Sequence, residues 1–269
     1  MKRLVILGAG ESGVFVSDYG KIKHNYKEVL GLNKINWEDE KHTEELILNA
    51  DVVMKSPGIP EKTHIVQKLI EKGIPVISEI EFAYQYTDAI TIGITGSNGK
   101  TTTTLLTYHL LKQGGLNVGL AGNIGKSFAW QVAEDKVDVY VLELSSFQLD
   151  GIVNYKPHIA VITNISPDHL DRYNYDYGLY IESKFRVTLN QNEEDFLIYD
   201  DDDEAISIWL KNNKIKAQKL PFSLTHKVEQ GSYLENKTLY NITNNKQINM
   251  PTTNLSLDGM HNVKNAMAA

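Results

Sequence analysis

The sequence predicts an α/β protein built on parallel strands, and three observations support this fold class. Short apolar runs alternate with segments of helical periodicity, which is typical of βαβ units around a parallel sheet. Glycine-containing loops at residues 8–13 and 96–99 each follow directly on an apolar run, as phosphate-binding loops do in this class. The 269 residues are 42% hydrophobic and 23% charged, which is ordinary for a chain with a buried core.

The expected strands are short apolar runs bounded by polar or turn residues. They lie at residues 3–7, 51–54, 75–77, 90–95, 137–143, 159–163 and 196–199. The expected helices lie between them, at residues 43–49, 64–72, 78–86, 100–112, 127–134 and 177–189. After Pro221, short alternating segments rich in Ser, Thr, Asn and Tyr predict small antiparallel strands on the flank of a domain. The acidic run at residues 200–204 is expected to form a solvated turn and a helix N-cap.

A change of pattern near residues 87–89 predicts a boundary between domains. At about 100–200 residues per domain, the chain has room for two. Residues 1–88 contain one nucleotide-fold-like unit, and a second unit with its own strand and glycine loop begins after it. We therefore expect domains at residues 1–88 and 89–269.

The charge and cysteine content exclude several classes of protein. The chain has 27 Lys and Arg against 34 Asp and Glu, a net charge of −7, so nucleic acid is not an expected partner. It has no cysteine, which excludes disulfides and thiolate metal sites and is typical of the reducing cytoplasm. The first apolar run stops at Gly8, and no stretch approaches the ~18 apolar residues of a membrane span. We expect neither a secretion signal nor a membrane partner.

The strongest motif is TGSNGKTT at residues 95–102, which joins an apolar strand to a helix. Backbone N–H groups in such a loop, together with the helix N-terminus, can cradle phosphates. Lys100 is placed to reach the β- and γ-phosphates of a nucleotide, and the Thr101 hydroxyl to bind Mg²⁺. The strict phosphate-loop pattern has Gly where this chain has Ile94, so a plain glycine turn stays open as the alternative.

A second glycine motif, GAGESG at residues 8–13, matches the dinucleotide-binding pattern G-x-G-x-x-G. That pattern continues into a helix, with an acidic residue ~20 positions further on. Here Asp18 comes only five residues after Gly13, which leaves no room for a helix. Either the crossover is deleted or about a dozen residues are missing from it. A plain glycine-rich turn is the alternative.

Polar side chains also follow two further predicted strands. Glu143 ends the strand at residues 137–143, and Asp168 and His169 follow the strand at residues 159–163. Ligands converge at the carboxyl edge of a parallel sheet, where a carboxylate and a neutral imidazole can bind Mg²⁺. A capping or buried glutamate and a structural histidine are the alternatives. Together with the phosphate loop these residues predict a Mg-ATP site and leave the phosphate acceptor open.

The loop TGSNGKT at residues 95–101 resembles that of the Mur ligase and folylpolyglutamate synthetase superfamily, whose loop also departs from the strict pattern. Further segments resemble the Mur ligases, and among these the members that add D-glutamate. They are SPGIP at 56–60, GNIG at 122–125, VLELSSFQL at 141–149, DHLDRY at 168–173 and LDGMHNVKNA at 257–266. The resemblance covers the whole chain.

The resemblance implies a Rossmann-like N-terminal domain for a uridine nucleotide-sugar, then a P-loop ATPase-type α/β domain with a small antiparallel flanking sheet. It implies that the family's C-terminal Rossmann-like domain is absent here, so that this fragment alone is inactive. In the implied reaction, ATP phosphorylates the carboxylate of UDP-N-acetylmuramoyl-L-alanine, and the amine of D-glutamate attacks the acyl phosphate. The implied enzyme uses ATP and Mg²⁺ and acts as a cytoplasmic monomer in peptidoglycan precursor synthesis.

The resemblance also implies roles for individual residues. Implied ATP contacts are Gly96, Ser97, Asn98, Gly99, Lys100, Thr101, Thr102, Asn262 and Asn265. Implied substrate contacts are Glu11, Ser12, Asp18, Ser56, Gly58, Asn123 and Ser145. Implied Mg²⁺ ligands are Thr101, Glu143, His169 and Lys184, and the implied catalytic residues are Lys100, His169 and Lys184. Lys184 matches the lysine that the family carbamylates, whereas its sequence context alone predicts a solvated helix lysine.

Other functions stay open. They are a different amide ligase of the superfamily, a catalytically silent nucleotide-binding fragment and a dinucleotide oxidoreductase. The nucleotide-sugar motifs at residues 8–13 and 56–60 argue against a folate-type ligase. The phosphate loop argues against an oxidoreductase, which would rest on residues 8–13 alone.

Overall fold

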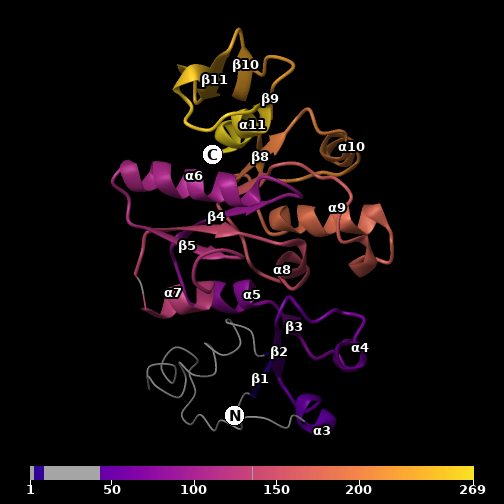
Figure 1. Ribbon diagram of the computed structural model, residues 1–269. Helices are drawn as coiled ribbons and strands as arrows, with labels where there is room; N and C mark the ends of the chain where they lie inside the picture. The colour runs from indigo at the N-terminus through magenta and orange to yellow at the C-terminus, as the bar shows by residue number, and fades with distance from the viewer. Residues whose placement is uncertain (1–2, 9–42, 135) are drawn as a thin grey trace. The chain divides into compact units, whose positions relative to one another are not determined.

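The computed structural model describes residues 3–8, 43–134 and 136–269, and Figure 1 shows the course of the chain. The chain forms two compact units. The first contains the described residues up to Asp88 together with Gly125–Lys136 and Phe147–Tyr155. The second contains Ala89–Ile124, Val137–Ser146 and Lys156–Ala269. Two segments from later in the chain therefore belong to the first unit.

The first unit is built on a three-stranded parallel sheet in the order β1-β2-β3. Its strands are β1 (Leu4–Leu7), β2 (Val52–Lys55) and β3 (Val76–Ile77). Its helices are α3 (Glu44–Ile47), α4 (His64–Glu71), α5 (Glu79–Tyr84) and α7 (Phe128–Glu134). Val5 and Val53 of the strands pack with Ile47 of α3 and Leu69 of α4 in one buried cluster. Removal of this apolar surface from water holds α3 and α4 against the sheet.

Two buried glutamates of α5 bind the later segments into the first unit. Glu79, 3% exposed, accepts a hydrogen bond at Oε1 from the backbone N–H of Ala129 at 2.5 Å. Glu81, 1% exposed, accepts at Oε2 from the N–H groups of Val153 at 2.9 Å and Tyr155 at 2.8 Å. A carboxylate can be buried at this depth because such donors replace its lost hydration.

The second unit is built on a nine-stranded sheet in the order β12-β11-β10-β9-β8-β7-β4-β6-β5. Its strands are β4 (Ile90–Thr95), β5 (Val118–Gly122), β6 (Val139–Glu143), β7 (Ile159–Ile162), β8 (Phe196–Asp200), β9 (Gln218–Ser223), β10 (Gly231–Glu235), β11 (Thr238–Thr243) and β12 (Lys246–Pro251). Parallel β6 and β7 flank β4, and Ile94 pairs with Glu143 on one side and Val161 on the other. The carboxyl ends of all three strands therefore meet around the loop that follows β4.

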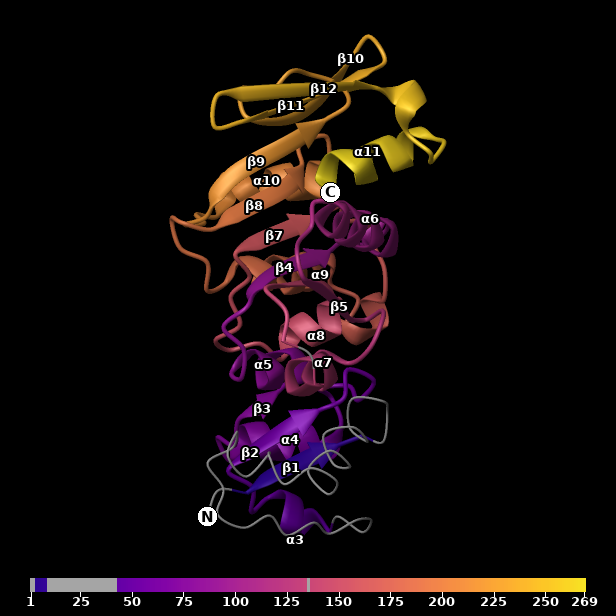
Figure 2. The ribbon, with the colours of Figure 1, turned by 90° about the vertical axis from the view of Figure 1, so that its left-hand side faces the viewer.

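Helices cover both faces of this sheet, as Figures 1 and 2 show. They are α6 (Lys100–Gln113), α9 (Tyr177–Phe185), α10 (Glu204–Asn212) and α11 (Met260–Ala268). Ile94 of β4 belongs to the buried cluster that contains Met267 of α11 and packs against α6. Successive strand residues point to opposite faces, so Thr95 points away from this cluster. Its hydroxyl contacts Lys184, which places α9 on the other face, beside α10.

The remaining helical segments of the described residues are short. They are α8 (Ser146–Asp150) and the 3-10 turns at Leu170–Arg172, Arg186–Thr188 and Thr252–Asn254. All seven predicted strands are present, with ends shifted by at most two residues. The predicted helix at residues 177–189 ends earlier, because α9 stops at Phe185 and a 3-10 turn follows. The sequence patterns missed β5, β9, α8 and α11, and they gave only the start of α10, through its N-cap.

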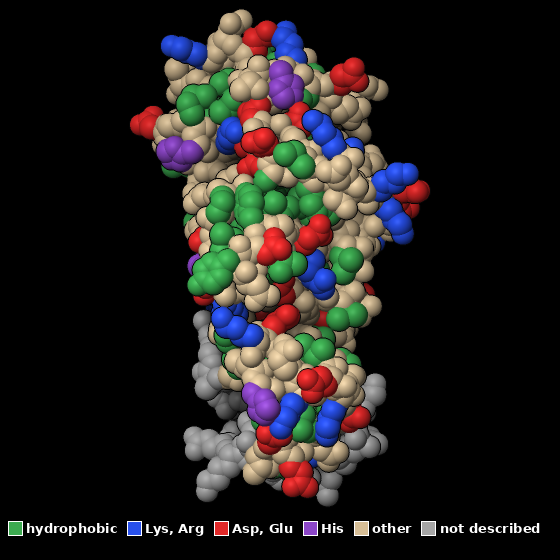
Figure 3. Space-filling model, turned by 90° about the vertical axis from the view of Figure 1, so that its right-hand side faces the viewer, with side chains coloured by type: hydrophobic (Ala, Val, Ile, Leu, Met, Phe, Trp, Pro, Cys, Tyr) green, Lys and Arg blue, Asp and Glu red, His purple; other side chains and the backbone are tan. Residues whose placement is uncertain are grey.

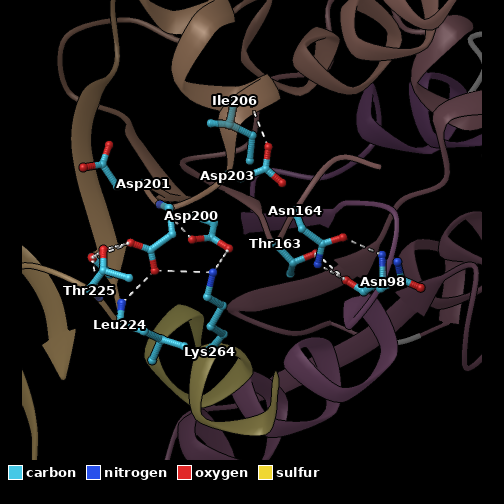
Figure 4. Close-up of polar contacts among 12 residues, drawn as sticks. Asn98, Thr163, Asn164, Asp200, Asp201, Asp203, Ile206, Leu224, Thr225 and Lys264 are labelled. Carbon is cyan, nitrogen blue, oxygen red and sulfur yellow. Dashed lines mark hydrogen bonds and ion pairs between the residues drawn. The ribbon is translucent and has the colours of Figure 1, made fainter. Parts of the chain in front are cut away.

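Two predictions are corrected in the last third of the chain. The antiparallel strands β10 to β12 do not form a separate sheet, because β10 pairs with β9 and extends the edge of the nine-stranded sheet. Asp203 caps α10 as predicted and accepts from the N–H of Ile206 at 3.0 Å (Figure 4). Asp200, however, is 2% exposed rather than solvated, because it pairs with Lys264 at 2.6 Å.

The surface carries both signs of charge. On the face drawn in Figure 3, acidic and basic side chains are interspersed with hydrophobic and uncharged ones. Within the part of the chain that the structure describes, no helix is long and apolar enough to span a membrane.

Candidate active site

The loop between β4 and α6 has the backbone of a phosphate-binding loop. Gly96 and Gly99 adopt φ angles of +146° and +79°. A Cβ atom would lie 2.0 Å from Thr163 Oγ1 at the first position and 2.3 Å from Asn265 Oδ1 at the second. Both positions therefore require glycine. Gly99 is the N-cap of α6, whose first N–H groups have no partner within the helix and can bind an anion.

The other loop residues differ in exposure. Ser97 is 7% exposed, and its Oγ donates to the carbonyl of Ser166 at 2.8 Å and lies 3.0 Å from the hydroxyl of Tyr180. Three further members of the predicted ATP site differ from Ser97, because Asn98 and Thr101 are exposed and Thr102 is partly exposed. Ser97 thus joins the loop to the protein interior, while Thr101 is exposed and its hydroxyl is accessible to a ligand.

Lys100 lies folded back on the loop. Its Nζ donates to the carbonyls of Gly96 at 2.9 Å and Ser97 at 2.8 Å. Burial lowers the pKa of Lys100, and the carboxylates of Glu143 and Asp168 oppose this shift by favouring the cation. The ammonium has three hydrogens, so two carbonyl bonds leave one for a phosphate. The electrostatic link shows that these two acidic residues lie near the loop.

Glu143 ends β6 as a buried carboxylate, 1% exposed. Its Oε1 accepts from the side-chain amide of Asn123, which follows β5, at 2.9 Å. Its Oε2 has no hydrogen-bond partner among the described residues. Ser145 follows two residues later and is partly buried. A buried carboxylate oxygen without a donor is unusual, and a divalent cation would satisfy it.

Asp168 and His169 lie in an exposed loop after β7. His169 has a left-handed φ of +49°, and the side chains of the two residues are 48% and 57% exposed. Nε2 of His169 lies 3.5 Å from Oδ2 of Asp168. Among the described residues, no three His, Asp or Glu side chains are grouped closely enough to hold a metal ion. The ligand set of Thr101, Glu143, His169 and Lys184 therefore stays a prediction.

Lys184 of α9 is 2% exposed, so the expectation of a solvated helix lysine is wrong. Its Nζ donates to the carbonyl of Gly96 at 2.9 Å and to Thr95 Oγ1 at 3.4 Å. It also lies 5.2 Å from the ring centroid of Tyr180. The carbonyl and the aromatic ring replace water around the cation, which makes this burial possible. Lys184 and Lys100 thus converge on a single carbonyl of the phosphate loop.

Helix α11 brings two predicted ATP contacts to the same loop. Asn265, 7% exposed, accepts at Oδ1 from the Thr103 hydroxyl of α6 at 3.4 Å. Its Nδ2 donates to Oδ1 of Asn262 at 3.2 Å, because residues three apart share a helix face. The fold therefore joins the end of the chain to Gly99 and the start of α6.

An ion pair fixes α11 to the carboxyl end of β8 (Figure 4). Lys264 Nζ lies 2.6 Å from Asp200 Oδ2 and 3.4 Å from Asp202 Oδ2. Burial raises the pKa of Asp200 to about 6, although Lys264 opposes the shift. Burial also acts to raise the pKa of Asp202, but hydrogen bonds from Ser223 and Thr225 outweigh it and lower the value to about 2.

The predicted uridine site is described only in part. Its members Glu11, Ser12 and Asp18 lie outside the described residues. Ser56 and Gly58 follow β2, and a Cβ on Gly8 would lie 2.6 Å from Ser56 Cβ. Lys55, 7% exposed, donates from Nζ to the carbonyl of Ile59 at 2.8 Å. The loop after β2 is therefore closed on itself and packed against the end of β1.

The sequence reasoning assigned no role to Asn164, Ser166 or Tyr180, which all contact the phosphate loop. Asn164 and Ser166 belong to the polar run directly after β7, the position where ligands converge on a parallel sheet. Tyr180 precedes Lys184 by one helical turn, so it shares the buried face of α9. The place of Asn164 and Ser166 after a strand, and the spacing of Tyr180 from Lys184, were the sequence signals that could have identified them.

Comparisons with known proteins identify the family of the chain. Residues 94–269 match the Mur ligase middle domain, and residues 2–65 match the MurD N-terminal domain. The UDP-N-acetylmuramoylalanine–D-glutamate ligases of Christiangramia forsetii and Bacteroides fragilis are 58% and 52% identical over 100% of the chain. The chain spans 63% of the length of each of these relatives.

A solved structure shows the same fold. It is the UDP-N-acetylmuramate:L-alanyl-gamma-D-glutamyl-meso-diaminopimelate ligase (MPL) from Neisseria meningitides, with a TM-score of 0.61 at 19% identity. The likeness covers 100% of this chain and 91% of that one. The middle-domain match spans most of the chain and includes the phosphate loop, Glu143, Lys184 and helix α11. The chain belongs to the Mur ligase family.

Proposed function

We propose that this chain is the nucleotide-binding part of an ATP-dependent ligase that joins D-glutamate to UDP-N-acetylmuramoyl-L-alanine in peptidoglycan precursor synthesis. The observation that carries the proposal is the convergence of Lys100, Lys184 and buried Glu143 on one glycine loop. The names of relatives that are 58% and 52% identical support the choice of substrates. Because the chain spans 63% of those relatives, D-glutamate binding and turnover would need the rest of their length.

The work would be divided along the chain. Residues 1–88 would hold the uridine nucleotide-sugar, and residues 89–269 would hold ATP. The loop after β2 supports the first part, because Ser56 and Gly58 lie at the carboxyl end of a parallel strand, where such sheets bind ligands. Asn123 and Ser145, which follow β5 and β6, would contact the muramoyl end of the substrate. We expect the enzyme to act as a cytoplasmic monomer.

The chemical difficulty is that two anions must meet, the γ-phosphate of ATP and the substrate carboxylate. Lys100 would neutralise charge on the β- and γ-phosphates, and the N–H groups at the start of α6 would bind their oxygens. Asn262 and Asn265 would hold the adenine side of the nucleotide from α11. A carboxylate oxygen then attacks the γ-phosphorus and ADP leaves. The amine of D-glutamate attacks the resulting acyl phosphate, and inorganic phosphate and a proton leave as the amide forms.

The residues present fit a magnesium ion. The orphaned Oε2 of Glu143 is a hard oxygen ligand, and the exposed Thr101 hydroxyl and the His169 imidazole are the other candidates. When bound, Mg²⁺ would withdraw charge from the phosphate oxygens of ATP. Proteins usually bind Mg²⁺ through one or two carboxylates together with the phosphates of the substrate, and this site has one buried carboxylate beside the phosphate loop.

We propose that Lys184 carries a carbamate in the active enzyme. Its neutral amine would add to CO₂ with release of a proton, which replaces a second cation beside Lys100 with an anion that has oxygen ligands for Mg²⁺. A carbamylated Nζ keeps one hydrogen, so it can keep the bond to the carbonyl of Gly96. The test is the structure of the longer enzyme with Mg-nucleotide bound. An unmodified Lys184 there, together with near-normal turnover of Lys184→Ala, would contradict the proposal.

Calorimetry tests the division of function. The chain itself should bind Mg-ATP and UDP-N-acetylmuramoyl-L-alanine but form no amide. The same chain extended to the length of its relatives should form an amide with D-glutamate, detected by mass spectrometry of the product. A folded chain that binds neither ligand would refute the proposal. An extended chain that prefers another amino acid would indicate a different ligase of the family.

A further inference from the structure

The side chain of Asn164 holds both polar groups of a single residue of the phosphate loop. Its Oδ1 accepts from the backbone N–H of Asn98 at 3.0 Å, and its Nδ2 donates to the carbonyl of Asn98 at 2.9 Å. Figure 4 shows the carboxamide of Asn164 turned toward Asn98 from the segment that follows β7. One planar carboxamide, with one donor and one acceptor, therefore forms two hydrogen bonds with the peptide groups of Asn98, as the backbone of a neighbouring strand would.

Two further hydrogen bonds join the segment after β7 to the phosphate loop. The carbonyl of Asn164 accepts from the N–H of Ser97 at 2.9 Å. The hydroxyl of Thr163 donates to the carbonyl of Asn98 at 2.6 Å. The N–H groups of Ser97 and Asn98 are thus committed to residue 164. The N–H groups at the start of α6 have no partner within the helix and can bind an anion.

We propose that Asn164 is a positioning residue for ATP. Its carboxamide fixes the peptide groups of Asn98 so that the phosphates meet the first turn of α6 and Lys100. The inference rests on the proposed binding of ATP to this loop and deepens it. Asn164 acts through the loop and not on the reacting atoms.

The chemistry of the contact predicts which substitutions fail. In Asn164→Asp the ionised carboxylate can accept from the N–H of Asn98 but cannot donate to its carbonyl. It also adds an anion beside the phosphate site. The protonated acid has one donor and one acceptor, like the amide, so lowering the pH should restore the contact. Asn164→Leu keeps the approximate size and can do neither at any pH.

Mg-ATP affinity of the chain is the direct test, measured by calorimetry at about pH 8 and about pH 5 for wild type and each variant. Loss of the paired contact should weaken binding by about ten- to a hundredfold at the higher pH. An ordinary aspartate pKa of about 3.9 leaves less than about a tenth of the carboxyl protonated at pH 5. The affinity of Asn164→Asp, taken as a ratio to wild type at the same pH, should therefore recover only part of a large loss at the lower pH. Asn164→Leu should not recover.

The ratio cancels the titration of ATP and of other groups near this segment. These include Asp203, whose Oδ2 accepts from the N–H of Ile165 at 2.9 Å, together with Asp168, Lys100 and Lys184. Asn192→Asp is the matched control. Its Oδ1 accepts from the N–H of Glu194 at 2.9 Å in a loop before β8, so it should alter stability at most.

Amide hydrogen exchange on the wild-type chain needs no variant. The N–H of Asn98 should be protected with and without Mg-ATP. An unprotected amide, or affinities of both variants within about twofold of wild type at the higher pH, would overturn the inference. A loss in Asn164→Asp that grows as the pH falls would also overturn it. Failure of the wild-type chain to bind Mg-ATP would overturn the proposed function as well, which distinguishes the two.

Discussion

Replacing Lys100 with methionine should separate nucleotide binding from folding. The substitution keeps most of the side-chain volume and removes the charge. In the structure the ammonium makes two hydrogen bonds, to the carbonyls of Gly96 at 2.9 Å and Ser97 at 2.8 Å. Their loss is destabilising. The burial that lowers the pKa of Lys100 shows that the cation also carries a desolvation cost, which methionine removes.

For folding, the loss of two hydrogen bonds and the removal of the desolvation cost oppose each other. For nucleotide binding, nothing compensates for the lost charge. Hydrogen bonds from a charged donor contribute about 1.5–3 kcal/mol each, and removing the buried charge offsets much of this. We therefore expect the free energy of unfolding to change by about 1 kcal/mol or less. Removal of a preorganised charge from developing phosphate charge typically costs about 10²–10³-fold, or about 2.7–4 kcal/mol.

Calorimetry with Mg-ATP and urea unfolding of the same samples measure both quantities. Lys112→Met is the matched control, because Lys112 lies exposed in the last turn of the same helix, α6. The control should change neither quantity appreciably. If Lys100→Met bound Mg-ATP within a few-fold of wild type, the assignment of this lysine to the phosphates would be refuted. If Lys100→Met lost several kcal/mol of unfolding free energy and bound Mg-ATP weakly only because it was unfolded, the claim that binding is separate from folding would be refuted.

Three further substitutions test the packing around the site and within the first unit. Gly99→Ala should weaken Mg-ATP binding at least tenfold in calorimetry, because its Cβ would lie 2.3 Å from Asn265 Oδ1; unchanged affinity would contradict this. Glu81→Gln should lower the free energy of unfolding by about 2 kcal/mol in urea, since an amide cannot accept from all its N–H donors. The pKa of Asp200 is about 6 in the folded protein against 3.8 for an unperturbed aspartate. The protonated carboxyl therefore stabilises the fold fully below pH 4, and this stabilisation is lost as the pH rises through 6. Unfolding free energy should fall by about 3 kcal/mol across that window, and Asp200→Asn should abolish the slope.

Two strands, the phosphate loop and one helix cap follow from local sequence. The strands at residues 90–95 and 137–143 were predicted because a run of apolar, β-branched residues favours a buried strand over any other local structure. The phosphate loop was predicted because its glycines adopt φ angles that other residues rarely reach, and these depend on a few neighbouring residues. The cap of α10 by Asp203 is equally local, since the side chain bonds an N–H three residues away.

Burial and pairing of individual polar groups were decided by tertiary structure alone. Lys184 and Asp200 both looked solvated in sequence, and both are 2% exposed. Lys184 is buried because Gly96, 88 residues earlier, supplies its acceptor, and Asp200 because Lys264, 64 residues later, supplies its cation. The grip of Asn164 on Asn98 likewise joins residues 66 apart. A residue's own neighbours set its backbone preference, but the partner that replaces its lost water comes from distant chain, and only the packed fold determines which partner that is.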